Sequence, residues 1–354
     1  MKRKHIILIV INGISLLFFA IMTIAAVSVK NSLPDQQTVG RWTDGNSRYA
    51  QVSVFTEASS AMSVDGIFTA RVDIEKKLVE NSLTSEKANA RVWVDAFSAD
   101  YGKLSVSSDY GKTETQTIVT GGDFFLFHPI ELVSGYYYSE DNLMQDRILI
   151  DEVLAWQLYG ATDIAGKPVL IESKYFYIAG VYKSSENSDI EKVTNGTPMM
   201  FMPYQGYEIL GKTPSFDCYE ACLPNPVTGL AEMIVTEAVP VKDINSEVVE
   251  NSSRYSLKNR FDIIRDFGMR SVKDNAIVYP YWENAARITE DKSALMLVFQ
   301  LLGLIIPICT AFAYVIIGYR KRKVFFNWFA NAVKSIFNKL LTKIKNRKAG
   351  IADE

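Results

Sequence analysis

The sequence is poor in the side chains that most often carry out catalysis or bind metals, with 2 His and 3 Cys among 354 residues. His5 lies in a short basic segment at the N-terminus, so His128 is alone in the remainder of the chain, where it precedes Pro129. No H-E-x-x-H, C-x-x-C or G-x-S-x-G pattern surrounds it, and a metal site requires clustered ligands. The sequence therefore predicts a structural histidine, no catalytic residue, no metal or cofactor site, and no enzyme activity.

The three cysteines do not form a disulfide framework. Cys218 and Cys222 lie in "SFDCYEACLP", which reads as a strand between two prolines. Four extended steps would place their Cα atoms about 13 Å apart, whereas a disulfide needs less than about 7 Å. Cys309 lies in a long apolar run. We expect three free thiols that pack as small apolar side chains.

A nucleotide-binding loop is nearly present but lacks essential parts. "YGATDIAGKPVLI" has five residues between Gly160 and Gly166, and Pro168 follows Lys167. A phosphate-binding loop has four residues between its glycines and a Ser or Thr after the lysine, whose hydroxyl binds magnesium. Proline has neither that hydroxyl nor a backbone N–H for a phosphate. The glycines are better explained as the end of a helix and the entry to a strand.

Two long stretches contain no charged residue. Residues 6–29 follow a basic N-terminal segment, 1–5, and residues 294–318 precede a basic tail, 319–354. A 24-residue helix is about 36 Å long, enough to cross a hydrocarbon core of about 30 Å. We interpret both stretches as membrane spans, with Pro307 tolerated in the second. For the first, a signal peptide cleaved near Ala26 is the alternative.

The basic residues beside the two stretches predict the orientation of the chain. Residues 30–293 carry 25 basic and 38 acidic side chains, a net charge of −13, whereas the basic flanks lie outside this segment. Because basic flanks stay on the cytoplasmic side, we expect both termini in the cytoplasm and residues 30–293 on the outer side of the cell membrane. The orienting residues are Lys2, Arg3, Lys4, Arg320, Lys321, Arg322 and Lys323.

The outer segment mixes strand and helix patterns, which predicts an α+β fold. "YAQVSVFT" and "ARVWVDAF" alternate as strands do, and residues 63–80 between them have helical spacing. "KLSVSSD" and "TETQTIVTG" are expected to form a hairpin at Tyr110-Gly111, followed by an aromatic loop over residues 121–142. Asp151 should cap a short helix that Gly160 ends. Acidic pairs such as Glu140-Asp141 and Glu290-Asp291 are interpreted as solvated surface.

Four segments of this region follow one another in a fixed order: "GGDFFLFHPIELVSGYYYSEDN", "ILIDEVLAWQLYGATDIAGKPVLI", "YFYIAGVYK" and "PMMFMPYQGYEIL". Together they resemble the extracellular core domain of MacB-like and FtsX-like ABC transporter permeases. The resemblance lies in the order of short motifs over about 80 residues. The matching positions are Phe124, Phe125, Gly135, Leu154, Tyr159, Gly160, Gly166, Lys167, Val169, Ile178, Gly180, Val181 and Pro203. Of these, Gly135, Gly160, Gly166, Lys167, Gly180 and Pro203 are expected to have structural roles.

The resemblance implies a large outer domain of two subdomains between the two spans. Strand-helix-strand units over residues 48–100 and 230–290 would form the membrane-proximal subdomain, and residues 101–229 a strand-rich insertion. Family permeases continue with third and fourth spans, whereas here a basic tail follows Gly318. Two spans with few polar groups cannot enclose a hydrophilic path, so further membrane chains are expected.

The implied function is that of a noncatalytic membrane subunit that couples a partner ABC ATPase to export or to an extracellular client. A further FtsX-like permease chain, or a homo-oligomer, would complete the assembly. The alternative is a membrane-tethered module that binds or senses a peptide or cell-wall component. Residues 324–347 form a basic amphipathic pattern that fits either membrane lipid or a cytoplasmic ATPase. Nucleic acid is not an expected partner of such a tethered helix.

Overall fold

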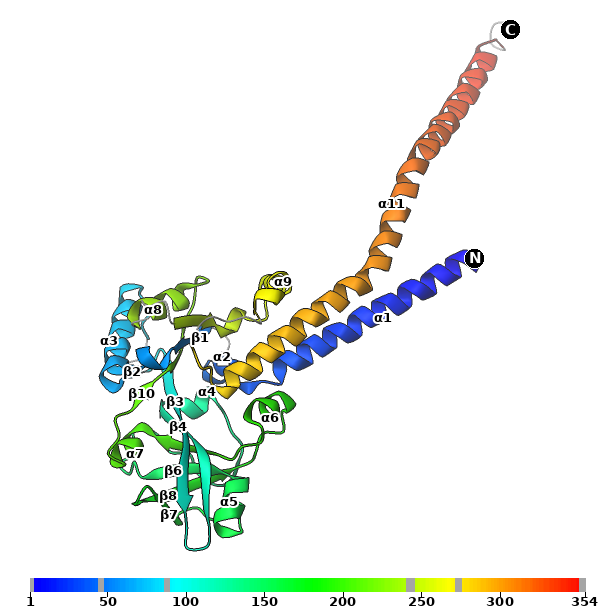
Figure 1. Cartoon of the computed structure of the whole chain (residues 1–354). Coiled ribbons are helices and arrows are strands. Elements are labelled where there is room, and N and C mark those ends of the chain that lie inside the picture. The colour runs from blue at the N-terminus through cyan, green and yellow to red at the C-terminus, as the bar shows by residue number, and fades with distance from the viewer. Residues whose placement is uncertain (1–2, 44–47, 86–89, 240–245, 271–275, 350–354) are drawn as a thin grey trace. The chain divides into compact units, whose positions relative to one another are not determined.

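The structure is a computed structural model that describes residues 3–43, 48–85, 90–239, 246–270 and 276–349, without the side chains of 269, 270 and most positions after 320. The chain divides into two compact units (Figure 1). One comprises Met1–Ala25 with Met296–Glu354, and the other comprises Ala26–Leu295. Both predicted spans are helical, in α1 (Arg3–Asn31) and α11 (Tyr281–Ala349), and both helices are long and apolar enough to cross a membrane.

Within the first unit, α1 contacts α11 one turn before a proline. Pro307 lies inside α11 and has no N–H, so the carbonyl of Gly303, four residues earlier, loses its intrahelical donor. The Ser15 hydroxyl of α1 donates to this carbonyl at 2.7 Å. A Cβ on Gly303 would come within 3.1 Å of the Phe18 ring, so glycine permits the close approach of the helices.

Polar side chains of the two spans pair with one another. Asn12 donates to the Thr310 hydroxyl at 3.2 Å, and Gln300 donates to the Thr23 hydroxyl at 3.1 Å. Thr23, Gln300 and Thr310 are among the few polar groups of the two spans. Here they join two helices, as polar groups in apolar surroundings do.

The second unit is built on one ten-stranded mixed sheet in the order β12-β1-β11-β3-β4-β9-β6-β8-β5, with β7 paired to both β3 and β8. Its strands are β1 (Tyr49–Thr56), β3 (Val94–Ser107), β4 (Lys112–Gly122), β5 (Leu132–Gly135), β6 (Arg147–Asp151), β7 (Pro168–Ile171), β8 (Lys174–Tyr182), β9 (Met199–Pro203), β11 (Cys218–Pro224) and β12 (Ser246–Glu250). A separate pair joins β2 (Met62–Ser63) to β10 (Ser215–Phe216).

Helices cover this sheet, which makes the fold α+β as predicted. They are η1 (Pro34–Gln36), α2 (Thr38–Trp42), η2 (Ala58–Ser60), α3 (Val64–Glu80), α4 (Phe124–Phe127), α5 (Glu152–Tyr159), α6 (Ser188–Thr194), α7 (Tyr204–Ile209), α8 (Leu230–Ala238), η3 (Asn251–Ser253), α9 (Leu257–Arg265) and α10 (Phe267–Arg270). Helices α3 and α8 pack side by side (Figure 1).

Strand alternation gives the centre of the sheet two different faces. In β1, Ala50, Val52 and Val54 join an apolar core with α3 and α8, whereas Gln51 and Ser53 point the other way. Strand β11 repeats the pattern, because its buried Glu220 pairs in register with Ser53. A buried polar layer therefore lies on the face opposite α3 and α8.

Several local predictions are confirmed. Strand β1 has the predicted bounds, the helix predicted over residues 63–80 is α3 with Ser63 as its N-cap, and the tip at Tyr110-Gly111 joins β3 to β4. Asp151 accepts from the Leu154 N–H at 2.7 Å, and Gly160 ends α5 in the left-handed conformation. The three cysteines are free.

Other local predictions are wrong in detail. The two strands expected before Tyr110 are one strand, β3, whose register shifts between Asp100 and Lys103, and Gly102 has a φ of +72° there. The aromatic stretch expected as a loop contains α4 and β5. One sheet takes strands from both predicted subdomains. The division into two subdomains stays a prediction.

Candidate functional site

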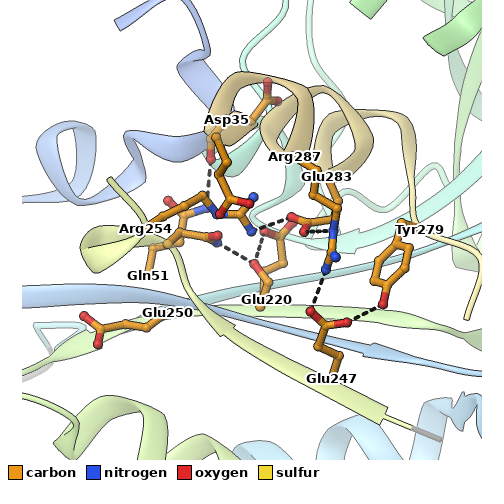
Figure 2. A network of polar contacts seen from close by, with 12 residues as sticks. Asp35, Gln51, Glu220, Glu247, Glu250, Arg254, Tyr279, Glu283 and Arg287 are labelled. Carbon is orange, nitrogen blue, oxygen red and sulfur yellow. Dashed lines mark hydrogen bonds and ion pairs between the residues drawn. The ribbon is translucent and has the colours of Figure 1, made fainter. Parts of the chain in front are cut away.

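A buried polar network lies where the chain enters and leaves the sheet unit (Figure 2). It connects the segment after α1 and the first turns of α11 to β1, β11 and β12. We call it the joint network, formed by a histidine cluster (Asp35, Gln51, Ser53, His128, Glu220, Asn251) and an arginine cluster (Glu247, Arg254, Tyr279, Glu283, Arg287, Glu290). All of these residues belong to the second unit.

The histidine cluster holds the segment that follows α1. His128, which caps the C-terminus of α4, is 1% exposed and has a carboxylate at each ring nitrogen. Its Nδ1 lies 2.8 Å from Asp35 Oδ1, and its Nε2 pairs with Glu220 Oε2. The Ser53 hydroxyl donates to the other Glu220 oxygen at 2.7 Å. Gln51 Nε2 donates to the Asp35 carbonyl at 2.8 Å, so both the backbone and the side chain of Asp35 are held.

The two carboxylates keep His128 protonated. Burial alone would lower its pKa, but the charge of Glu220 and the hydrogen bonds to Glu220 and Asp35 outweigh burial and raise the pKa to about 9. Burial likewise opposes ionisation of Glu220, yet the facing imidazolium lowers the pKa of that carboxyl. The raised pKa favours the protonated ring at neutral pH, and this ring lies between the carboxyl groups of Asp35 and Glu220.

The arginine cluster holds the start of α11. Arg254 is 2% exposed, donates to Glu283 Oε2 at 2.6 Å, and lies 3.4 Å from Glu290 Oε1. Arg287 Nε donates to the second Glu283 oxygen at 2.6 Å, and its Nη2 reaches Glu247 of β12 at 2.6 Å. The Arg287 guanidinium also lies 4.0 Å from the centroid of the Tyr279 ring. Glu283 thus bridges two guanidinium groups at the first turn of α11.

The two clusters come together through Trp282, the second residue of α11. Its ring centroid lies 4.1 Å from that of His128 and 5.7 Å from that of Phe124. Trp282 is 2% exposed. The residue before Glu283 therefore packs on the ring that pairs with Asp35 and with Glu220 of β11, so the segment after α1 and the start of α11 meet at His128.

Chemically, the network is suited to holding segments in place. His128 is covered on all sides, so a substrate cannot reach either ring nitrogen. Among the residues that the structure describes, no group of three or more His, Cys, Asp or Glu is placed to hold a metal ion. Buried, directional ion pairs strongly resist loss of one partner, because the remaining charge would be buried alone.

The motif residues predicted from the sequence lie elsewhere, at turns and strand pairings within residues 135–203. Gly135 pairs in register with Gly180, and a Cβ on Gly135 would come within 2.1 Å of the Ala179 carbonyl oxygen. Gly160 and Gly166 have φ of +66° and +82°. Exposed Lys167 follows the second of these turns. Pro203 ends β9 and immediately precedes α7. The structure thus brings together Gly135 and Gly180, while the family role of the set stays a prediction.

The predicted orienting residues occupy the ends of the apolar helices. Arg3 and Lys4 begin α1, and Arg320 to Lys323 continue α11 beyond the apolar run. Lys2 lies outside the described residues. Helix α11 extends through the predicted amphipathic tail, but most side chains of that tail lie outside what the structure describes.

The sequence interpretation missed most of the joint network. Glu140 and Glu290 are not simply solvated surface: Glu140 pairs with Arg71 at 3.0 Å, and Glu290 lies beside Arg254. Two signals were available. Glu220 is a lone charge within the otherwise uncharged strand "CYEACLP", and Glu283 precedes Arg287 by one helical turn.

Comparison with known proteins places the domain in a family. The model of the MacB-like periplasmic core domain matches residues 6–245. No curated protein matches the chain. The extracellular domain of the noncanonic ABC-type transporter YknZ from Gram-positive bacteria is 12% identical, with 56% of this chain and 99% of that chain covered and a TM-score of 0.39. The periplasmic region of MacB from Actinobacillus actinomycetemcomitans is also 12% identical, with 63% of this chain and 94% of that chain covered and a TM-score of 0.41.

Proposed function

Because the chain belongs to the family of MacB-like periplasmic core domains, we propose that it is a noncatalytic membrane subunit of an ABC transporter, coupling a partner ATPase to export or to an extracellular client. The observation that carries this proposal is the joint network. Within the second unit, buried ion pairs hold the segment after α1 and the first turns of α11 on the sheet, as a domain that transmits movement through these segments would need.

The first test identifies the assembly. Crosslinking of the full chain in native membranes, followed by mass spectrometry, should capture an ABC ATPase and a further permease chain. A chain that stays monomeric at every crosslinker length would contradict the proposal. Removal of residues 324–347 should weaken the ATPase contact if the tail docks on it, and leave it intact if the tail lies on lipid.

The second test asks whether the joint transmits movement. Arg287→Met removes the link between α11 and Glu247 but leaves the more deeply buried pair of Arg254 and Glu283. It should reduce stimulation of the partner ATPase by the full chain several-fold while association is unchanged. Lys212→Met, which removes a partly exposed pair with Glu172 after α7, is the matched control. If the two variants stimulated the partner ATPase equally, the joint network would have no role in coupling.

Orientation is tested by labelling from outside the cell. In a Cys309→Ala background, Leu143→Cys lies at a fully exposed position of the sheet unit, and Val333→Cys lies in the basic part of α11. An impermeant maleimide should label the first and spare the second until the membrane is opened. Labelling of position 333 from outside would reverse the proposed topology.

A cavity supports the second candidate function, a tethered module that binds a peptide or cell-wall component. This cavity, of about 480 Å³, is lined by Asp217, Tyr279, Tyr281 and Trp282. Burial raises the pKa of Asp217 to about 7. Saturable binding of such a ligand by the full chain, lost in Asp217→Asn and with no ATPase neighbour, would favour this function over coupling.

A further inference from the structure

Helix α9 is anchored on one face and exposed on another. The Arg260 guanidinium donates twice to the Ser293 carbonyl of α11, from Nε at 3.1 Å and from Nη2 at 2.8 Å. Ile263 of the same face is 6% exposed. The helix lies outside residues 6–245, which the family model matches. Its position beside α11 is therefore a feature of this chain that the family match does not describe.

One stripe of α9 is apolar and partly exposed, and it lies beside the exposed charged side chains of Lys258 and Arg265 and the half-buried Asp262. Leu257 is 63% and Phe261 49% exposed, and half-buried Ile264 lies between that pair and the anchored face. With 3.6 residues per turn, these three side chains share one stripe. Exposed Lys258 lies along the edge of the stripe. A nine-residue helix that leaves such a stripe uncovered has the pattern of a helix that lies in a membrane interface.

The anchor residue of α11 sets the depth of α9. Ser293 is the last residue before the charge-free stretch 294–318, and Lys292 is the last charge before it. The headgroup regions add about 5 to 7 Å to each side of a hydrocarbon core of about 30 Å. A helix hydrogen-bonded to Ser293 is therefore at the level where water gives way to lipid.

We propose that α9 is an interfacial helix, whose stripe of Leu257, Phe261 and Ile264 inserts between the lipid headgroups of the outer leaflet. The occupant of this face is the bilayer itself, because α9 is held at Ser293, the residue that precedes the charge-free stretch. Phe267 of α10 is also 62% exposed. Contact with lipid at this point would fix the tilt of the sheet unit against the membrane, whether or not the chain serves a transporter.

The test places a fluorescent label on the stripe. The full chain with Cys309→Ala and Phe261→Cys is labelled with an environment-sensitive dye and reconstituted in nanodiscs of phosphatidylcholine and phosphatidylglycerol. Cys218 and Cys222 are buried and should not react. We expect blue-shifted emission and several-fold quenching by lipids that carry a nitroxide near the headgroup, with weaker quenching by lipids that carry it at the chain end.

Two further positions make the result interpretable. Leu257→Cys should give the same result, which protects the test against misfolding of the first variant. Val72→Cys on α3, 67% exposed, should keep aqueous emission without quenching. Aqueous emission at both α9 positions would overturn the proposal. Blue-shifted emission that lipid nitroxides do not quench would also overturn it, because a protein partner would then cover the stripe.

Discussion

The joint network and the β7–β8 pair both contain buried side chains, but they are held together by different means. The joint contains His128, Glu220, Arg254 and Glu283, four charged groups with 2% or less of their surface exposed. The buried side chains of β7 and β8 carry no charge, and the neighbouring β5 pairs antiparallel with β8, with Gly135 opposite Gly180. Apolar packing is non-directional, so it stabilises a unit without fixing the orientation of its segments. Ion pairs between defined partners also fix that orientation.

The largest effect is expected from breaking the arginine cluster. Arg254→Met leaves Glu283 with less compensation in a buried site, and should lower the free energy of unfolding by about 3 to 5 kcal/mol. Chemical denaturation of the full chain in detergent measures this value. Lys212→Met, at a partly exposed pair, should stay within about 0.5 kcal/mol of the wild type. If the Arg254 variant were equally mild, the joint would not be an energetic centre of the fold.

The histidine cluster should make stability depend on pH. The pKa of His128 in the folded chain, about 9, lies above its ordinary value of 6.5. Its contribution, about 3 kcal/mol for such a shift, is thus complete below pH 6.5 and is lost as pH rises through 9. Denaturation at several pH values should show this slope in wild type and in His5→Gln, but not in His128→Gln. An equal slope in all three chains would assign it to another group.

Glycine substitutions test the apolar region around β5, β7 and β8 and the turn that ends α5. Gly135→Ala would force a Cβ to within 2.1 Å of the Ala179 carbonyl oxygen at a φ of +82° and should destabilise by about 3 kcal/mol. Gly160→Ala meets open space at a φ of +66° and should cost about 1 kcal/mol. Thermal unfolding ranks the two variants. The reverse order would mean that the paired strands β5 and β8 move apart at a lower energetic cost than their geometry indicates.

The smallest effect is expected at Lys167, which is exposed after the turn at Gly166. Lys167→Ala should change stability by no more than about 0.5 kcal/mol. Equilibrium dialysis should detect no saturable ATP binding by the wild-type chain. Specific micromolar affinity that this variant loses would restore the nucleotide-loop interpretation of Gly160 to Pro168.

Local elements were predictable from the sequence because short-range chemistry determines them. Ser63 caps α3, and Asp151 and Gly160 bound α5, all through contacts within a few residues. The joint network was not predictable in this way. His128 meets Asp35 and Glu220 across 93 and 92 positions, and only the assembled sheet brings them together. Alternation in β11 could indicate that Glu220 was buried, but it could not identify the partner.

The contact between Ser15 and Gly303 limits how the two spans can slide. Sliding α11 past α1 by one turn, about 5.4 Å, would remove the serine from the single carbonyl that Pro307 leaves without a donor. In lipid, no water would replace it. Piston-like travel of one span along the other is therefore disfavoured, and a stroke that reaches this pair should tilt both helices as one body.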